Sequence, residues 1–186
     1  MIQVIDDAID IQIQNEILHY CYDPNVTYSF NKFSTSAYSR IPLRSFTHIF
    51  YSIHGSLSPF NDIFSQPAKI VVPEKEMVRG RIFLQMPKET SEVGEFHIDF
   101  YEPHYTMLYY ANDTDGDTVF STVNELSLTE IENEFEKFNH ANQQSKILKT
   151  VSPKKGRCVL FDGLIYHASS TPTQNERFVI NYNFKL

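Results

Sequence analysis

The chain has 186 residues, a length that fits one domain with a sizeable buried core. Its content of 41% hydrophobic and 14% aromatic residues excludes a disordered chain, and 15 Phe and 11 Tyr without any Trp favour a β-rich fold. The formal charge of −7 argues against a general nucleic-acid-binding surface, which needs an excess of Lys and Arg to neutralise phosphates.

The N-terminal segment and the cysteines indicate where in the cell the protein is located. The N-terminus "MIQVIDDAID" carries acids where a signal peptide would carry a basic region, and no run reaches the apolar length of a membrane span. Cys21 and Cys158 are too few for a disulfide framework, so we expect two reduced thiols. These features predict a soluble, cytoplasmic protein with no membrane partner.

The N-terminal 78 residues give few clear elements. Residues 2–5 alternate weakly and predict a short strand, and Asp10 is a plausible N-cap for a helix that ends near Cys21. Residues 22–60 show no clear division into elements. The run "AKIVV" (68–72) predicts a brief strand ended by Pro73.

From Arg79 onward, short strand-like runs alternate with turn residues. The predicted strands are "RGRIFLQM", "EFHIDF", "HYTMLYYAN", "GDTVFSTV", "ILKTV", "GRCVLF", "LIYHAS" and "RFVINYNF". A helix is expected from about Thr129 to Ala141, with Ser127 or Thr129 as its N-cap. This pattern predicts a single domain over 1–186, mainly β, an antiparallel sandwich or barrel with supporting helices.

One of these runs carries a pair of metal-ligating residue types. In an extended "EFHIDF", His97 and Asp99 project to the same face, because side chains two positions apart point the same way. The alternative is a half-buried strand with two polar residues on its outer face. His167 follows a strand and the Asp162–Gly163 turn, and two strands that cross in a barrel can bring it to the pair. The other histidines are expected at the surface, in loops or in the core.

As an ordered set, these motifs resemble the 2-oxoglutarate- and iron(II)-dependent oxygenases, especially the branch around the prolyl 4-hydroxylases, phage-encoded members included. The resemblance covers about residues 79–184. It rests on "HID" (97–99), "MLYYANDTDGDTVF" (107–120), "PKKGRCVLFDGLIYHASSTP" (153–172) and "NERFVINYNF" (175–184), in which Arg177 follows His167 by ten positions. It implies a double-stranded β-helix, or jelly-roll, core of the cupin-like type, with residues 1–78 as supporting and substrate-facing elements.

The resemblance also implies the site. His97, Asp99 and His167 would form the facial triad that holds iron(II), and 2-oxoglutarate and O2 would occupy the remaining positions, with ascorbate as an accessory reductant. Arg177 would bind the far carboxylate of 2-oxoglutarate; the alternative is a surface arginine at the start of an edge strand. Tyr110, rather than Tyr109, would make a second contact. The expected reaction is hydroxylation of a protein or peptidyl residue such as proline, an amino acid or a small molecule, with release of succinate and CO2.

Two other functions stay open at this point. An AlkB-like nucleic-acid demethylase has the same fold, but that branch carries a second arginine six residues after the first, where this chain has Asn183. The other is a non-catalytic β-helix protein that binds a metal without turnover or binds only a partner, and the complete ligand set and Arg177 count against it. A zinc-dependent hydrolase could also use His, Asp and His ligands, but it would not need Arg177 at this spacing.

Overall fold

The computed structural model describes residues 1–32, 38–40 and 43–186 of the chain. The elements, in chain order, are β1 (Ile2–Ile5), α1 (Ile11–Cys21), β2 (Ser29–Asn31), β3 (Ser45–Ser52), β4 (Gly55–Ser56), α2 (Asn61–Phe64), α3 (Gln66–Val71), β5 (Met77–Gln85), β6 (His104–Tyr110), β7 (Thr118–Asn124), the 3₁₀ helix η1 (Glu125–Leu128), α4 (Glu134–Gln144), β8 (Ile147–Val151), β9 (Cys158–Asp162), β10 (Ile165–Ser169) and β11 (Arg177–Lys185). The fold is mostly β, as the composition predicts.

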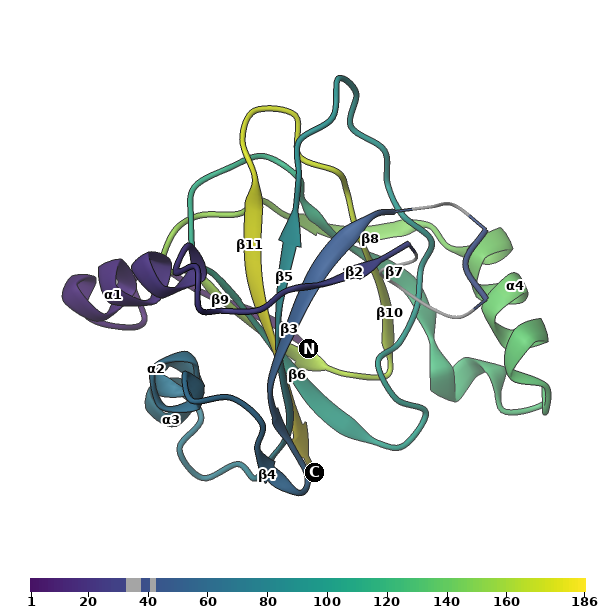
Figure 1. Ribbon diagram of the computed structural model, residues 1–186. Coiled ribbons are helices and arrows are strands. Elements are labelled where there is room, and N and C mark those ends of the chain that lie inside the picture. The colour runs from purple at the N-terminus through teal and green to yellow at the C-terminus, as the bar shows by residue number, and fades with distance from the viewer. Residues whose placement is uncertain (33–37, 41–42) are drawn as a thin grey trace.

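Two antiparallel sheets build the molecule (Figure 1). The larger sheet has the strand order β1-β9-β6-β11-β5-β3-β2, with β4 paired to β3, and the smaller sheet has the order β10-β7-β8. Neighbouring strands of the larger sheet come from distant parts of the chain, and this crossing connectivity is that of a jelly roll. The predicted β-helix core is therefore confirmed.

Strand β11 lies at the centre of the larger sheet, between β5 and β6. Its even-numbered residues Phe178, Ile180, Tyr182 and Phe184 enter the apolar core between this sheet and the N-terminal helices. Its odd-numbered residues face the smaller sheet, where Val179 joins a second apolar cluster with Phe120 of β7. The period of two along one strand thus separates a helix-covered core from an inner face that carries Arg177, Asn181 and Asn183.

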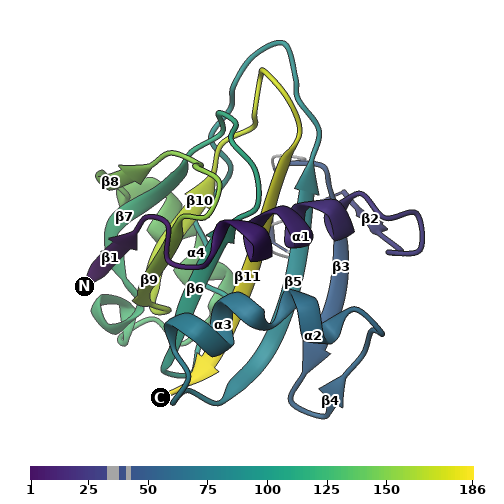
Figure 2. The ribbon, with the colours of Figure 1, turned by 90° about the vertical axis from the view of Figure 1, so that its left-hand side faces the viewer.

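Helices α1, α2 and α3 cover the outer face of the larger sheet, whereas α4 lies on the opposite side of the molecule (Figures 1 and 2). Helix α1 begins as predicted, because the Asp10 carboxylate accepts a hydrogen bond from the Gln12 backbone N–H at 2.8 Å. Ile17 and Cys21 bury its apolar stripe in the core. Cys21 and Cys158 are both buried and free, and none of the described helices is long and apolar enough to cross a membrane.

The expected strand at "AKIVV" is wrong, because Gln66–Val71 forms helix α3. Pro67 stands in the first turn, where the missing N–H of proline costs nothing and its fixed φ suits a helix. Pro67 and Ala68 are the buried residues of this short helix. A short apolar run carries too little periodicity to distinguish a strand from a helix.

Two further expectations need correction. "EFHIDF" forms no regular strand, and an isolated bridge pairs its His97 with His167 of β10. A second isolated bridge joins Val93 to Ser170, just outside these two segments. The expected helix from Thr129 to Ala141 runs instead over Glu134–Gln144, and its N-cap is Asn133, whose side chain accepts from the Glu136 N–H. The helix is capped by Asn133, which directly precedes the acidic first turn, rather than by Ser127 or Thr129 further upstream.

Gly80 in the middle of β5 provides a test of the packing behind the inner face. A Cβ at this position would lie 2.4 Å from the ring of Phe50, a fully buried side chain that packs on Phe64 and Tyr182. We expect Gly80→Ala to lower the free energy of unfolding by about 1–3 kcal/mol, the usual cost of overpacking. Urea unfolding measures this, and combining Gly80→Ala with Phe50→Leu should cost less than the sum of the single changes. An unchanged midpoint for Gly80→Ala would contradict the packing.

Candidate active site

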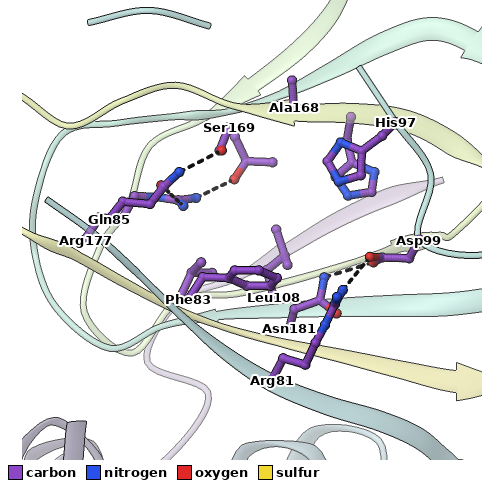
Figure 3. A pocket seen from close by; sticks show the side chains of 13 residues that line it. Arg81, Phe83, Gln85, His97, Asp99, Leu108, Ala168, Ser169, Arg177 and Asn181 are labelled. Carbon is purple, nitrogen blue, oxygen red and sulfur yellow. Dashed lines mark hydrogen bonds and ion pairs between the residues drawn. The ribbon is translucent and has the colours of Figure 1, made fainter. Parts of the chain in front are cut away.

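A cavity of about 60 Å³ lies on the inner face of the larger sheet (Figure 3). Since one water needs about 10–15 Å³ on this measure, the cavity has room for several waters or a small organic acid. It is lined by Arg81, Phe83, Gln85, His97, Asp99, Leu108, Thr118, His167, Ala168, Ser169, Arg177, Val179 and Asn181. Four of the five residues predicted for the site, His97, Asp99, His167 and Arg177, therefore share one cavity.

Two backbone hydrogen bonds bring the histidines together. The His97 N–H donates to the His167 carbonyl at 3.0 Å, and the His167 N–H donates to the His97 carbonyl at 2.9 Å. Directly opposed residues of an antiparallel pair project to the same side. The two imidazole rings accordingly lie with their centroids 4.6 Å apart.

The protonation state of both imidazoles suits metal binding. The Nδ1 atom of His97 lies 3.4 Å from the Glu95 carbonyl, and Nδ1 of His167 lies 3.1 Å from the Ile165 carbonyl. A carbonyl only accepts, so these contacts place the ring proton on Nδ1 and leave a lone pair on Nε2. Burial lowers the pKa of His97 to about 3, with His167 adding to the effect, and burial also lowers the pKa of His167. Both rings are therefore neutral at physiological pH.

Asp99 is engaged on both oxygens. Oδ1 accepts from Arg79 at 2.8 Å and from Arg81 at 2.7 Å, and Oδ2 accepts from Asn181 at 2.9 Å and from Asn183 at 3.0 Å. Burial alone would raise the pKa of Asp99, but the two guanidiniums hold it well below its usual range. Burial lowers the pKa of Arg79 to about 10, which still leaves a cation at neutral pH.

The three predicted ligands are of residue types that bind iron(II), but their side chains are not arranged as a metal site. Two neutral imidazoles and one carboxylate are a donor set that suits iron(II). Within the described part of the chain, however, no three His, Cys, Asp or Glu side chains are arranged to hold a metal ion. Asp99 also receives four hydrogen bonds, which use the lone pairs that a metal would need. Metal binding thus requires Asp99 to exchange at least one hydrogen bond.

Arg177 stands at the other end of the cavity. Its side chain is 2% exposed, and it donates to the Gln85 side chain at 2.8 Å and to the Thr118 hydroxyl at 3.0 Å. Its Nε is buried without a hydrogen-bond partner, and the described residues give it no carboxylate within ion-pair distance. The alternative of a surface arginine is wrong. A buried guanidinium without a counter-ion is costly unless an anionic ligand compensates it.

The choice between the two tyrosines follows the alternation of β6. Tyr110 faces Arg177, whose guanidinium carbon lies 5.4 Å from the Tyr110 ring centroid, and Tyr109 faces the helix-covered core. The Tyr110 hydroxyl donates to Thr118, the residue that also accepts from Arg177. Tyr110 does not line the cavity itself, so its direct contact with 2-oxoglutarate stays a prediction.

The sequence reasoning missed the partners from β5. Arg79, Arg81 and Gln85 all point to the inner face, two toward Asp99 and one toward Arg177. The signal was present in "RGRIFLQ", where an alternating strand with polar residues on one face indicates a lined pocket as readily as a solvated surface. Asn181 of β11 also lines the cavity and donates to Asp99.

No family model matches the chain, and no curated protein is similar to it in sequence. Solved structures do resemble it. The epimerase SnoN of nogalamycin biosynthesis, described as non-heme and α-ketoglutarate-dependent, superposes with a TM-score of 0.65 at 12% identity, covering 98% of this chain and 75% of that one. An oxidoreductase of the 2OG-Fe(II) oxygenase family from Burkholderia pseudomallei gives 0.61 at 9% identity, covering 99% and 84%.

A prolyl-4-hydroxylase from Pseudomonas putida gives a TM-score of 0.61 at 10% identity, covering 99% of this chain and 91% of that one. These likenesses extend over nearly the whole chain, N-terminal helices included, although the identities are low. The chain has the fold of the 2-oxoglutarate- and iron(II)-dependent oxygenases.

Proposed function

We propose that this chain is an iron(II)- and 2-oxoglutarate-dependent oxygenase, with His97, Asp99 and His167 as the metal ligands. The observation that carries the proposal is Arg177, a buried guanidinium that forms no ion pair with any described carboxylate, in the same cavity as two neutral imidazoles. The pair of sites matches the two ends of a metal-chelating diacid. The fold supports the same class of reaction.

Each part of the cavity has a task in this reaction. Iron and 2-oxoglutarate, when bound, supply O2 activation and oxidative decarboxylation to succinate and CO2, with oxygen inserted into a C–H bond of the prime substrate. Arg177 holds the far carboxylate through charge-assisted hydrogen bonds, and Gln85 and Thr118 keep its guanidinium oriented. Leu108 and Val179 line the cavity with apolar surface that limits the entry of water.

The prime substrate is a separate question. We propose hydroxylation of a protein or peptidyl residue such as proline, an amino acid or a small molecule, and the similar structures span an epimerase and a prolyl hydroxylase. Ascorbate as an accessory reductant and the cytoplasmic location stay predictions. A non-catalytic protein is the second candidate, and the saturated carboxylate of Asp99 is the observation that favours it.

Anaerobic titration with iron(II) tests the metal site. We expect a weak visible charge-transfer band only when iron(II) and 2-oxoglutarate are both present, and its loss in His167→Ala, since a facial triad with one imidazole missing holds the chelate poorly. His140→Ala, a change at an exposed histidine of α4, is the matched control and should keep the band. No band in the wild-type protein would favour the non-catalytic candidate.

Arg177→Gln tests the diacid site. Truncating one partner of a buried, hydrogen-bonded charge pair costs about 2–5 kcal/mol, so the Kd for 2-oxoglutarate should rise at least about 30-fold. Calorimetry with Mn(II)-loaded protein measures both affinities, and the Mn(II) affinity should change less than about threefold. Arg157→Gln, at an arginine that pairs with Asp6 on the surface, should leave both values unchanged. Equal loss of both affinities would remove the assigned role of Arg177.

Tyr110→Phe and Tyr109→Phe form a matched pair on opposite faces of β6. Loss of the Tyr110 hydroxyl removes a hydrogen bond to Thr118 behind Arg177, so the 2-oxoglutarate requirement should rise about threefold to tenfold. The Tyr109 hydroxyl is buried without a partner, and its removal should not affect the 2-oxoglutarate requirement. Succinate release at varied 2-oxoglutarate concentration measures both. The reverse order of effects would reassign the contact to Tyr109.

A further inference from the structure

Arg79 and Arg81 stand together on the inner face of β5 and share one carboxylate. Both guanidiniums donate to the same oxygen of Asp99, at 2.8 and 2.7 Å. Their side chains are 21% and 19% exposed, so solvent screens them only in part. In a chain of net charge −7, this arginine pair is a local excess of positive charge.

Loading the site does not remove that excess. The two positive charges of iron(II) and the two negative charges of 2-oxoglutarate cancel each other. Of the described residues that line the cavity, Asp99 is the one carboxylate, whereas Arg81 and Arg177 are guanidiniums and Arg79 joins them at Asp99. Asp117 acts electrostatically on Arg177 from beyond ion-pair distance, so the excess positive charge lies at the pair of Arg79 and Arg81. Excess positive charge in a partly buried site favours a further anion.

The arginine pair also has hydrogen-bonding capacity that the fold leaves unused. The Nε of Arg81 is buried without a partner, and its guanidinium carbon lies 4.9 Å from the ring centroid of Phe83, which restricts its motion. Arg79 donates from Nε to Asn183 and stacks at 3.9 Å over Phe100. Both guanidinium groups are therefore held in place, and the Nε donor of Arg81 is unused, as in a preorganised anion site.

Metal binding would change the state of this pair, an argument that rests on the proposed function. All four hydrogen bonds of Asp99 come from Arg79, Arg81, Asn181 and Asn183. A metal that takes one oxygen of Asp99 must displace donors from it. If the displaced donors are the guanidiniums on Oδ1, they become available to a ligand as the metal enters.

Arg79 also lines an apolar groove. The groove has a volume of about 610 Å³, and Arg79 lines it together with Ile49, Ile53, Leu57, Phe100 and Pro103. Ile53 is 65% exposed and Leu57 is 58% exposed, so the groove offers apolar surface that is open to a ligand. Its other charged residues, Glu102 and Lys185, have opposite signs. A molecule with an apolar body and one anionic group matches this combination.

We propose that Arg79 and Arg81 bind the anionic group of the prime substrate, a carboxylate or a phosphate, once the metal withdraws Asp99 from them. The apolar body of the substrate lies in the groove beside Phe100. Metal loading and substrate capture are then coupled, and by linkage each strengthens the other. The substrate therefore binds tightly only when the metal is bound.

Calorimetry with three small probes tests this coupling. Phenyl phosphate and phenylacetate present the two anionic groups on an apolar ring, and benzyl alcohol is the neutral control. With 2-oxoglutarate present throughout, Mn(II) should tighten the binding of an anionic probe at least about tenfold and leave benzyl alcohol unchanged. Tighter binding of phenyl phosphate would identify a phosphate ester, and tighter binding of phenylacetate would identify a carboxylate.

Asp99→Asn provides an arm that needs no metal. Without its charge, the arginine pair is unpaired from the start, so the metal-free variant should bind the anionic probe within about threefold of the Mn(II)-loaded wild type. Adding Arg81→Gln to Asp99→Asn should abolish this binding. Lys69→Gln in the wild type removes an exposed cation of α3 that pairs with Asp62 outside the groove, and it should leave probe binding unchanged.

Three results would overturn the inference. The first is that anionic probes bind no tighter than benzyl alcohol to both the loaded wild type and Asp99→Asn. The second is retained binding after Arg81→Gln in the loaded wild type, and the third is an equal loss of binding in Lys69→Gln. If the wild type binds no Mn(II) but metal-free Asp99→Asn binds the anionic probe, the oxygenase proposal fails and the anion site stands. The Arg81→Gln comparison in the wild type keeps the test valid should Asp99→Asn not fold.

Discussion

The alternation of strand β11 is the constraint on which the rest of the structure depends. Its even-numbered aromatic and aliphatic side chains anchor the helix-covered core, and its odd-numbered positions carry Arg177, Asn181 and Asn183 to the inner face. Hydrogen bonds to β5 and β6 on both sides hold the strand in register. A slip of one residue would exchange the two faces, so the core and the site stabilise the same register.

Around this strand, the molecule collects polar groups that are costly to bury. Arg177 is buried without a carboxylate partner, Asp99 is surrounded by four donors, and two neutral imidazoles lie in contact. Of the described polar side-chain atoms that are buried without a hydrogen bond, those of Arg81, Arg177 and Asn181 all belong to residues that line one cavity. Unpaired polar groups concentrated in one place indicate a site built for a ligand rather than for stability.

Asp99 connects the two halves of the site. It belongs with the histidines as a metal ligand and with Arg79 and Arg81 as their counter-ion, and one carboxylate cannot serve all of these partners fully at once. A metal at this carboxylate would have to compete with the four donors that it already holds. Asp99 also joins the metal site to the apolar groove that Arg79 lines.

Features controlled by short-range chemistry were predictable from the amino-acid sequence. The Asp10 cap, the alternation of β5 and β11 and the turn at Asp162–Gly163 all follow from neighbours a few residues apart. The ordered motifs also placed His97, Asp99, His167 and Arg177 in one predicted site, and these four residues do share a cavity. Local patterns failed where length was too short to show a period, as at α3, or where several caps competed, as at α4.

Which charged groups compensate one another depends on the folded arrangement of the strands. The partners of Asp99 lie 18 and 20 positions upstream on β5 and more than 80 positions downstream on β11. No local rule selects such pairs, because sheet order rather than sequence spacing brings them together. The pairing of His97 with His167 and the lack of any described carboxylate within ion-pair distance of Arg177 have the same origin. Charge balance in a buried site is a property of the assembled sheets, since burial and distance set the strength of each interaction.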